Sequence, residues 1–300
     1  MSTSEEDPRQ GDVSHAEEPE QGFMRELSQF LIVPSLVVLL CVAIFVMFGL
    51  LTSEDKTARE FLQEVRSGQG NDRWQAAFEL SRLIAQQPDL GRDETLTGEI
   101  VAVIENEGAH DPLIRKYLII ALENLGNPGA APTILKLLGD ADPDVRLQAA
   151  RAASTLEGVE EAVEPLAALL QEEDPAMRKV ATYALGQTKD EAAIEHLLPR
   201  LEDPSEDVRW NAAVALAVLG DASGRDVIAQ MLDRGHLDAI EGISESQKVN
   251  ALINGVQAVY LLRDREMLER IRDLSREDPS LNVRQIAMEA VEAIEAEQDR

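Results

Sequence analysis

The side chains that most often carry catalysis or hold metals are few and scattered in this sequence. Its four histidines and one cysteine are His15, His110, His196, His236 and Cys41. A metal centre needs several donors that converge on one point, and single histidines spread along the chain do not provide it. The nearest approach to a paired donor motif is Glu195 followed by His196. We therefore predict no metal site and no cofactor.

Motifs for other kinds of catalysis are also missing. The sequence has no phosphate-binding loop, dinucleotide-binding fingerprint, nucleophile elbow or zinc-protease motif. Acidic pairs such as Glu172 and Glu173 are typical of solvated turns and need no acid–base role. One cysteine cannot form a disulfide within the chain. From these observations we predict that the protein is not an enzyme.

The composition favours an acidic, all-helical protein. The sequence has 56 acidic and 28 basic residues, a net charge of -28, and only 4% aromatic residues. This charge repels phosphate backbones, so nucleic-acid binding is excluded. A basic or neutral partner would be attracted, although an acidic surface that simply maintains solubility accounts for the charge equally well. Abundant Ala and Leu favour helices that pack through small side chains.

The N-terminal part predicts a tail followed by a membrane anchor. Residues 1–29 are acidic, with almost nothing to bury, and predict a disordered tail. Residues 30–51 read FLIVPSLVVLLCVAIFVMFGLL without a charge, which as a helix spans about 33 Å, the thickness of a bilayer core. The preceding tail is not basic and no small-residue cleavage site follows, so we interpret the segment as an uncleaved single-pass transmembrane helix rather than a signal peptide. A buried helix of a soluble domain is the alternative.

The basic residues that flank this segment predict its orientation. Arg25 precedes it, whereas Lys56, Arg59 and Arg66 follow it. Under the positive-inside rule the C-terminal part, residues 52–300, is expected in the cytoplasm and the protein in the inner membrane of the cell.

Residues 52–300 repeat a short motif in which Asp-Pro is followed by a basic residue. The motif occurs at 111–115, 142–146, 174–178, 203–209 and 278–284. Two further basic residues, Arg73 and Lys248, fit the same register, as does Arg284 at the end of the fifth motif. The spacing of about 31 residues predicts seven units.

Each unit is predicted to be a helical hairpin. The Asp can cap the first N–H groups of the second helix, and the Pro fits the first helical position because its missing N–H is not needed there. The third, fourth and seventh residues after each basic residue share one helical face and are small or apolar, as in Ala149, Ala150 and Ala153. One hairpin cannot bury this face alone, so the units are expected to stack into a solenoid.

From about Thr57 to the C-terminus the sequence resembles the short bacterial HEAT-like repeats, also called phycobilisome-lyase-type repeats. The resemblance implies a right-handed α-solenoid of about seven hairpins. It also implies that polar ladders link successive repeats through three aspartates and three arginines of the motif: Asp142, Asp174, Asp203, Arg146, Arg178 and Arg209. In relatives that resemble deoxyhypusine hydroxylase, His-Glu dipeptides hold a di-iron centre, and this sequence has no such dipeptide.

Two irregularities interrupt the repeats. Arg73 and Arg115 are separated by 42 residues, and the unit with Lys248 contains an extra stretch, residues 234–246. Insertions in solenoids form surface loops, so this stretch is interpreted as a lengthened connection, with a recognition loop as the alternative.

A row on the second helices predicts where a partner binds. Its members lie two or five residues after the basic residue, away from the core positions, and the candidates are Phe78, Tyr117, Ile120, Arg151, Tyr183 and Val214. Apolar and aromatic side chains with a flanking Arg are typical of interaction surfaces. The alternative is that they pack sideways against the next second helix.

The function predicted from these features is that of a membrane-anchored scaffold. The lipid bilayer would hold residues 30–51, and a protein partner, such as a subunit of a membrane complex, would bind the concave face of the solenoid. The alternative is an enzyme of the same repeat superfamily, similar to a bilin lyase or a hydroxylase.

Overall fold

The computed structural model describes residues 33–52, 56–106, 110–157 and 160–296. Within these ranges the regular structure is helical, without strands. Two compact units are present, Met1–Lys56 and Thr57–Arg300. The predicted acidic tail, residues 1–29, lies outside the described residues, as does His15.

The first unit contributes helix α2, Val33–Thr52, whose sequence carries no charge. Among the residues that the structure describes, no helix has both the length and the apolar character that a membrane span requires. The anchor predicted over residues 30–51 is therefore not supported. The described helix spans Val33–Thr52, whereas the uncharged run spans residues 30–51. Residues 30–32 lie outside the described part of the chain.

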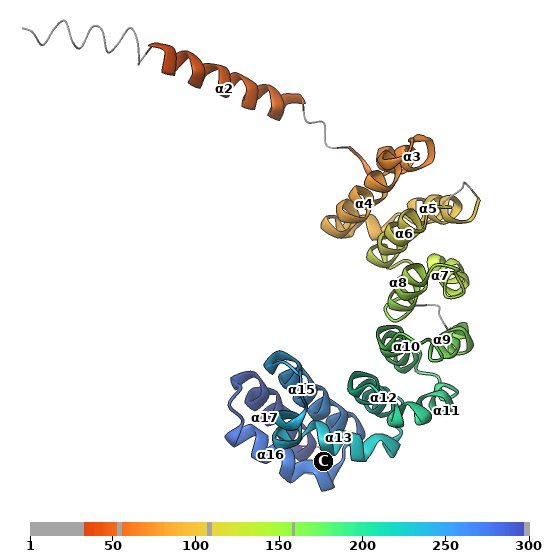
Figure 1. Cartoon of the computed structure of the whole chain (residues 1–300), viewed down its shortest axis with the longest axis vertical. Helices are drawn as coiled ribbons and strands as arrows, with labels where there is room; N and C mark the ends of the chain where they lie inside the picture. The colour runs from red at the N-terminus through yellow and green to blue at the C-terminus, as the bar shows by residue number, and fades with distance from the viewer. Residues whose placement is uncertain (1–32, 53–55, 107–109, 158–159, 297–300) are drawn as a thin grey trace, which may run out of the picture. The chain divides into compact units, whose positions relative to one another are not determined.

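The second unit is a stack of helical hairpins (Figure 1). In each hairpin the second helix is longer than the first. The first helices are α3 (Ala58–Ser67), α5 (Glu94–Asn106), α7 (Ala131–Leu137), α9 (Val163–Leu169), α11 (Ala193–Leu197), α13 (Arg225–Met231) and α16 (Leu268–Glu277). The second helices are α4 (Asn71–Gln86), α6 (Pro112–Leu125), α8 (Pro143–Ala153), α10 (Pro175–Gln187), α12 (Glu206–Val218), α15 (Glu245–Leu262) and α17 (Leu281–Ala296). Successive second helices pack on one another from α4 to α17. The predicted all-α solenoid of helical hairpins is confirmed.

The Asp-Pro motif starts three of the second helices as expected. The side chains of Asp111, Asp142 and Asp174 accept hydrogen bonds from backbone N–H groups two residues later, at 2.8–2.9 Å. Each following Pro occupies the first turn. A cap of this kind contributes about 1 kcal/mol to helix stability. At Asp203 and Asp278 the sequence continues with Pro-Ser, and the helices begin three residues later, at Glu206 and Leu281.

The predicted core positions are buried in the first five repeats. Residues three, four and seven positions after each basic residue are at most 3% exposed there: Ala76, Ala77, Leu80, Leu118, Ile119, Leu122, Ala149, Ala150, Ala153, Ala181, Thr182, Leu185, Ala212, Ala213 and Leu216. The buried side chains form two clusters, one from Ala58 to Leu216 and one from Trp210 to Ile294. Helix α12 contributes to both clusters, so it joins the two parts of the core.

Arginines at the start of the second helices link neighbouring repeats. We call the ion pairs Arg115–Asp140, Arg146–Glu172 and Arg178–Asp203, at 2.9, 2.7 and 2.9 Å, the arginine ladder. Arg146 and Arg178 also donate to the backbone carbonyl oxygen six residues earlier, at 2.9 and 3.0 Å. Each arginine therefore fastens its own inter-helix turn and the turn of the next repeat.

The acceptors of the ladder differ in part from those that the resemblance implied. Asp142 and Asp174 cap helices, and the ladder uses Asp140 and Glu172, two residues earlier. Asp203 occupies the ladder position, six residues before Arg209. Arg209 pairs with Glu206 of its own helix. The ladder thus ends at repeat five.

The extra stretch at 234–246 contains a helix, α14 (Arg234–Ala239), rather than only a loop. Leu237 is fully buried in the second cluster. Arg234 donates to both carboxylate oxygens of Asp278 in the last repeat, at 2.8 and 3.0 Å, and Lys248 pairs with Asp238 of α14. Arg234 therefore makes the ladder contact that the register assigns to Lys248. Through this contact the insertion connects repeats six and seven.

Candidate functional site: the face of the second helices

The six candidate binding residues lie on five successive second helices. Phe78 is on α4, Tyr117 and Ile120 are on α6, and the others follow in order, Arg151 on α8, Tyr183 on α10 and Val214 on α12. Phe78 and Tyr183 are 39% and 46% exposed, and Arg151 is also exposed. The remaining three side chains are half-buried. The row is therefore accessible at α4, α8 and α10.

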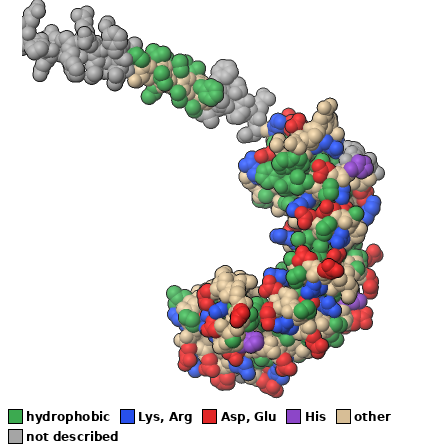
Figure 2. Space-filling view, in the orientation of Figure 1, with side chains coloured by type: hydrophobic (Ala, Val, Ile, Leu, Met, Phe, Trp, Pro, Cys, Tyr) green, Lys and Arg blue, Asp and Glu red, His purple; other side chains and the backbone are tan. Residues whose placement is uncertain are grey.

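Phe78 and Tyr117 form an aromatic pair between α4 and α6. Their ring centroids are 5.3 Å apart at an interplanar angle of 70°, an edge-to-face contact. Such pairs contribute about 0.5–1.5 kcal/mol beyond the area they bury. Figure 2 shows apolar side chains gathered over α4 on this face. At these two positions the sideways packing that we considered as the alternative is present, while part of the Phe78 ring stays exposed.

A groove on α6, α8, α10 and α12 brings two of the candidates together. We call it the α8–α10 groove. Its volume is about 300 Å³, and it is lined by Glu123, Arg151, Ser154, Thr155, Lys179, Val180, Tyr183 and Asn211. Phe78, Tyr117, Ile120 and Val214 do not line it. The groove therefore depends on four successive repeats, as expected for a surface that a solenoid builds by stacking.

The three charged side chains that line the groove differ in their hydrogen-bond and ion-pair partners and in their exposure to solvent. Lys179 Nζ lies 2.9 Å from Asp207 Oδ2 of α12. Glu123 accepts a hydrogen bond of 2.8 Å from Gln148 Nε2. Burial raises the pKa of Glu123 above its usual value, although Arg151 and Gln148 act in the opposite direction. The carboxylate of Glu123 is therefore partly removed from solvent, while the guanidinium of Arg151 remains exposed.

Sequence reasoning missed several residues of the groove. Lys179 follows Arg178 directly, and Glu123 and Ser154 lie eight residues after Arg115 and Arg146. Positions one, five and eight after a basic residue share a helical face, because a helix has 3.6 residues per turn. Extending the predicted row by one turn in each direction would have identified them.

The six motif residues assigned to structure lie outside the groove. Asp142 and Asp174 cap helices, Arg146, Arg178 and Asp203 form ladder pairs, and Arg209 donates to the carbonyl oxygen of Asp203. The three aspartates are at the inter-helix turns, and the three arginines are in the first turn of the second helix that follows.

The described histidines do not gather into a metal centre. His196 Nε2 lies 3.6 Å from Glu164 and 3.8 Å from Glu195, whereas His110 precedes α6 and His236 is in α14. Among the described residues no group of three or more His, Cys, Asp or Glu is placed to hold a metal ion. The di-iron centre that the hydroxylase resemblance implies therefore does not fit the donors described.

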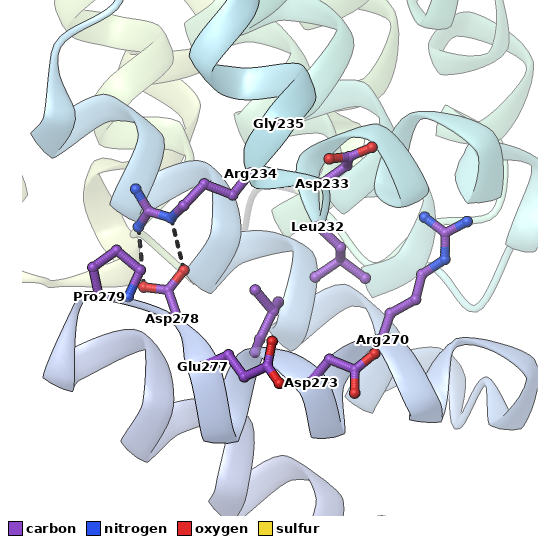
Figure 3. Close-up of a pocket in the computed structure, with 10 residues that line it drawn as sticks. Leu232, Asp233, Arg234, Gly235, Arg270, Asp273, Glu277, Asp278 and Pro279 are labelled. Atoms are coloured by element: carbon purple, nitrogen blue, oxygen red, sulfur yellow. Dashed lines mark hydrogen bonds and ion pairs between the residues drawn. The ribbon is translucent and has the colours of Figure 1, made fainter.

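A second cavity, of about 340 Å³, lies between the turn before α14 and helix α16 (Figure 3). The Arg234–Asp278 pair stands on one side, and Asp273 and Arg270 lie toward the other. Asp233 caps α14 through the His236 N–H, and Arg270 donates to the Ala229 carbonyl oxygen. None of the sequence-predicted binding residues lines this cavity.

Comparison with known proteins identifies the repeats. A family model described as HEAT repeats matches residues 101–174 and 163–246. A deoxyhypusine hydroxylase from Neurospora crassa is 39% identical over 75 residues, which make up 24% of this chain and 23% of that protein. The chain thus matches less than a quarter of the length of this relative.

Solved structures show the same fold. The complex of CpcE and CpcF of phycocyanin lyase from Nostoc sp. PCC7120 includes a chain with a TM-score of 0.55 and 20% identity, covering 80% of this chain and 88% of that one. The Escherichia coli protein YibA has a TM-score of 0.50 and 15% identity, covering 94% and 99% of the two chains. At these identities the likeness concerns the fold.

These comparisons correct one prediction. We predicted from missing motifs that the protein is not an enzyme, but the sequence relative is named a hydroxylase and one structural neighbour belongs to a lyase. The physical reason is that a repeat protein can assemble a site from residues on several helices, so a search for contiguous motifs does not exclude catalysis.

The stacked helical hairpins thus agree with the description of the matched model. The findings support a HEAT-like repeat protein, with the matched HEAT repeats at residues 101–246.

Proposed function

We propose that the protein binds a partner protein through the face of its second helices and acts as a scaffold. The α8–α10 groove is the observation that carries this proposal. It combines the half-exposed ring of Tyr183, the exposed guanidinium of Arg151 and side chains from four repeats. Tyr and Arg are enriched among the residues that dominate protein–protein binding energies. The ladder and the alanine-rich core hold these side chains in fixed register.

Site-specific photocrosslinking tests the proposal. Benzoylphenylalanine at position 183 is expected to form a discrete adduct in cells, because that side chain faces the proposed partner. The same probe at Lys136, exposed on the first helix α7, is the matched control and is expected to form no such adduct. Equal adducts from both positions, or none from 183, would contradict a binding role for this face.

Attachment to a membrane is a separate part of the proposal. Helix α2 exposes large apolar side chains from Leu36 to Met47, a surface of the kind that membranes or partners cover. We propose that the α2 segment attaches the chain to the inner membrane with the repeats in the cytoplasm, which would raise the local concentration of a membrane-bound partner. The check is fractionation at alkaline pH. Wild type is expected in the membrane pellet and a Val38→Arg, Ile44→Arg variant in the supernatant, and an unchanged distribution would contradict the attachment.

An enzyme of the same superfamily is the second candidate, favoured by the 39% identity to a deoxyhypusine hydroxylase over 75 residues. The test is mass spectrometry of a deoxyhypusine-containing protein incubated with the purified chain, iron(II), dioxygen and a two-electron reductant, so that one oxygen atom can enter the substrate and the other leave as water. A mass gain of one oxygen atom would establish hydroxylation. The same reaction with an Arg151→Ala variant would show whether the groove takes part.

A further inference from the structure

Helix α17 exposes a position that the rest of the stack buries. In the first six repeats the fourth residue after the basic residue is 0% exposed: Ala77, Ile119, Ala150, Thr182, Ala213 and Leu252. In repeat seven the same position holds Met288, which is 50% exposed. At Ala213 the cover comes from the next repeat, since a Cβ atom added at Gly224 would lie 2.7 Å from the Ala213 Cα. Met288 therefore lies on the face to which a following repeat would pack.

A stripe along α17 extends this open face. We call Leu281, Arg284, Met288, Val291 and Glu295 the α17 stripe. These residues are spaced by three or four positions, so they share one side of the helix. Leu281 is 73% exposed and Val291 is half-buried. Because the end repeats of a solenoid need a polar outer face to stay soluble, an apolar stripe here indicates a surface that another molecule covers.

Arg284 has an unused ladder contact in this stripe. It donates to the carbonyl oxygen of Asp278, six residues earlier, at 2.6 Å. Arg146 and Arg178 make the same backbone contact and also bind a carboxylate of the following repeat. Among the described residues, Arg284 makes no ion pair, and the Asp278 carboxylate is bound to Arg234. The guanidinium of Arg284 therefore has donors left for a carboxylate on the molecule that covers this face.

The other end of the stack does not offer that carboxylate. The ladder acceptors Asp140, Glu172 and Asp203 each lie six residues before the basic residue of their own repeat. In repeat one this position is Ser67, six residues before Arg73. A head-to-tail stack of copies would therefore leave the ladder contact of repeat seven unfilled.

Two α17 helices that pack antiparallel do complement each other. A two-fold axis between residues 289 and 290 places Met288 opposite Val291 of the second copy, and Arg284 opposite Glu295. Glu295 is 43% exposed and accepts from Arg272 through Oε1, so Oε2 remains for the guanidinium of the other copy. By symmetry the charged pair forms twice, on both sides of the apolar contact.

We propose that two copies of this chain bind each other through the α17 stripe, with α17 antiparallel to α17 of the second copy. Arg284 of each copy then takes a carboxylate in its ladder position, and Met288 is covered as its counterparts in the other repeats are. The candidate binding residues on α4–α12 lie outside the stripe, so the dimer carries two binding faces. The proposal does not depend on the proposed scaffold function.

Sedimentation velocity of the purified full chain tests the dimer. Mild detergent covers the apolar side chains of α2, and about 0.15 M salt screens the repulsion between two acidic copies beyond about 8 Å. Wild type is expected as a dimer. Met288→Arg is expected to raise the dimer dissociation constant at least about tenfold, because unpaired guanidinium groups enter the apolar contact. Leu113→Arg on α6, at a leucine that is 37% exposed, is the matched control and should leave the mass unchanged.

A charge exchange tests the antiparallel register. Arg284→Glu and Glu295→Arg are each expected to weaken the dimer, because like charges then face each other. The double variant is expected to recover it, since the pair forms again with reversed signs. Positions 284 and 295 are about 16 Å apart along one helix, so the two side chains cannot pair within a copy. Recovery can therefore come only from contact between copies.

Three results would overturn the proposal. They are a monomeric wild type, a dimer that persists in Met288→Arg, and a double variant that stays as weak as the single ones. Dissociation by Val38→Arg, Ile44→Arg without an effect of Met288→Arg would assign the contact to α2 instead. Circular dichroism spectra equal to wild type confirm that each variant is folded.

Discussion

At the scale of single residues, Asp203 shows how the repeats are fastened. Its side chain is 1% exposed and accepts both hydrogen bonds from Arg178 at 2.9 Å. Burial alone would raise the pKa of Asp203, but the hydrogen bonds from Arg178 and from the Ser205 N–H lower it below its ordinary value. The buried carboxylate is thus stable only as a charged partner of Arg178.

We expect Asp203→Asn to lower the free energy of unfolding by about 3 kcal/mol, because removal of one partner leaves a nearly buried charge uncompensated. Urea denaturation measures this loss. Asp174→Asn is the matched control, since Asn caps a helix about as well as Asp and the Asp174 side chain is exposed. Equal losses in both variants would mean that the Arg178 pair adds nothing beyond local capping.

The same residue predicts a pH dependence. Because the folded pKa of Asp203 is lowered, its contribution to stability is complete above the unfolded pKa of about 3.9 and is lost as pH falls through the folded pKa. The difference in stability between wild type and Asp203→Asn is therefore expected to stay constant from pH 7 to about 4 and to shrink below that. A difference that stays constant below pH 4 as well would contradict this assignment.

At the scale of elements, the second helices approach one another through small residues. A Cβ atom added at Gly186 on α10 would lie 2.7 Å from the Ala215 Cβ and 2.9 Å from the Ala215 Cα of α12. Distances below 3.0 Å require the helices to move apart. This contact keeps α10 and α12 in position, and both helices line the α8–α10 groove.

Gly186→Ala is expected to destabilise the protein by about 1–3 kcal/mol, because overpacking against a backbone outweighs the better helix propensity of Ala. Gly98→Ala on α5 is the control, since its added Cβ would meet nothing within 4 Å and is expected to stabilise the protein by up to about 1 kcal/mol. Thermal unfolding of both variants checks the signs. A stabilising effect at position 186 would show that the two helices can separate freely.

The sequence predicted the hairpins well because their cause is local. The distances between the basic residues define the repeats, and the Asp-Pro motifs at 111, 142 and 174 start helices where expected. The acceptors of the ladder were harder to predict, since each turn contains several acidic residues and only the backbone geometry decides which one caps and which one bridges. The groove was found in part, at Arg151 and Tyr183, because Glu123, Ser154 and Lys179 lie one helical turn away from the predicted row.

At the scale of the whole second unit, the two hydrophobic clusters predict unequal responses to mutation. Leu252 on α15 is fully buried in the second cluster, and Leu118 on α6 is fully buried in the first. The arginine ladder does not continue from repeat five to repeat six, where Arg209 pairs with its own helix. Repeat proteins transmit stability between neighbours, so a weak interface limits how far a perturbation spreads.

Leu252→Ala, which should cost about 2–5 kcal/mol, is expected to accelerate hydrogen exchange in residues 225–296 much more than in α6, α8 and α10. Leu118→Ala, its counterpart in the first cluster, should show the reverse pattern. Exchange measured by mass spectrometry resolves the two regions. An even increase over both clusters would show that the second unit unfolds as one cooperative block.

The helix inserted in repeat six also bears on how this protein could be lengthened or shortened. In a regular solenoid any internal unit can be duplicated or removed, because each one offers the same contacts to its neighbours. Here Arg234 on α14 takes the place of the repeat arginine and binds Asp278, while Lys248 is occupied with Asp238. A copy of repeat five placed before repeat seven would bring the regular arginine but not α14 and its buried Leu237. Repeats six and seven are therefore an inseparable module, and exchange of units is confined to the repeats before them.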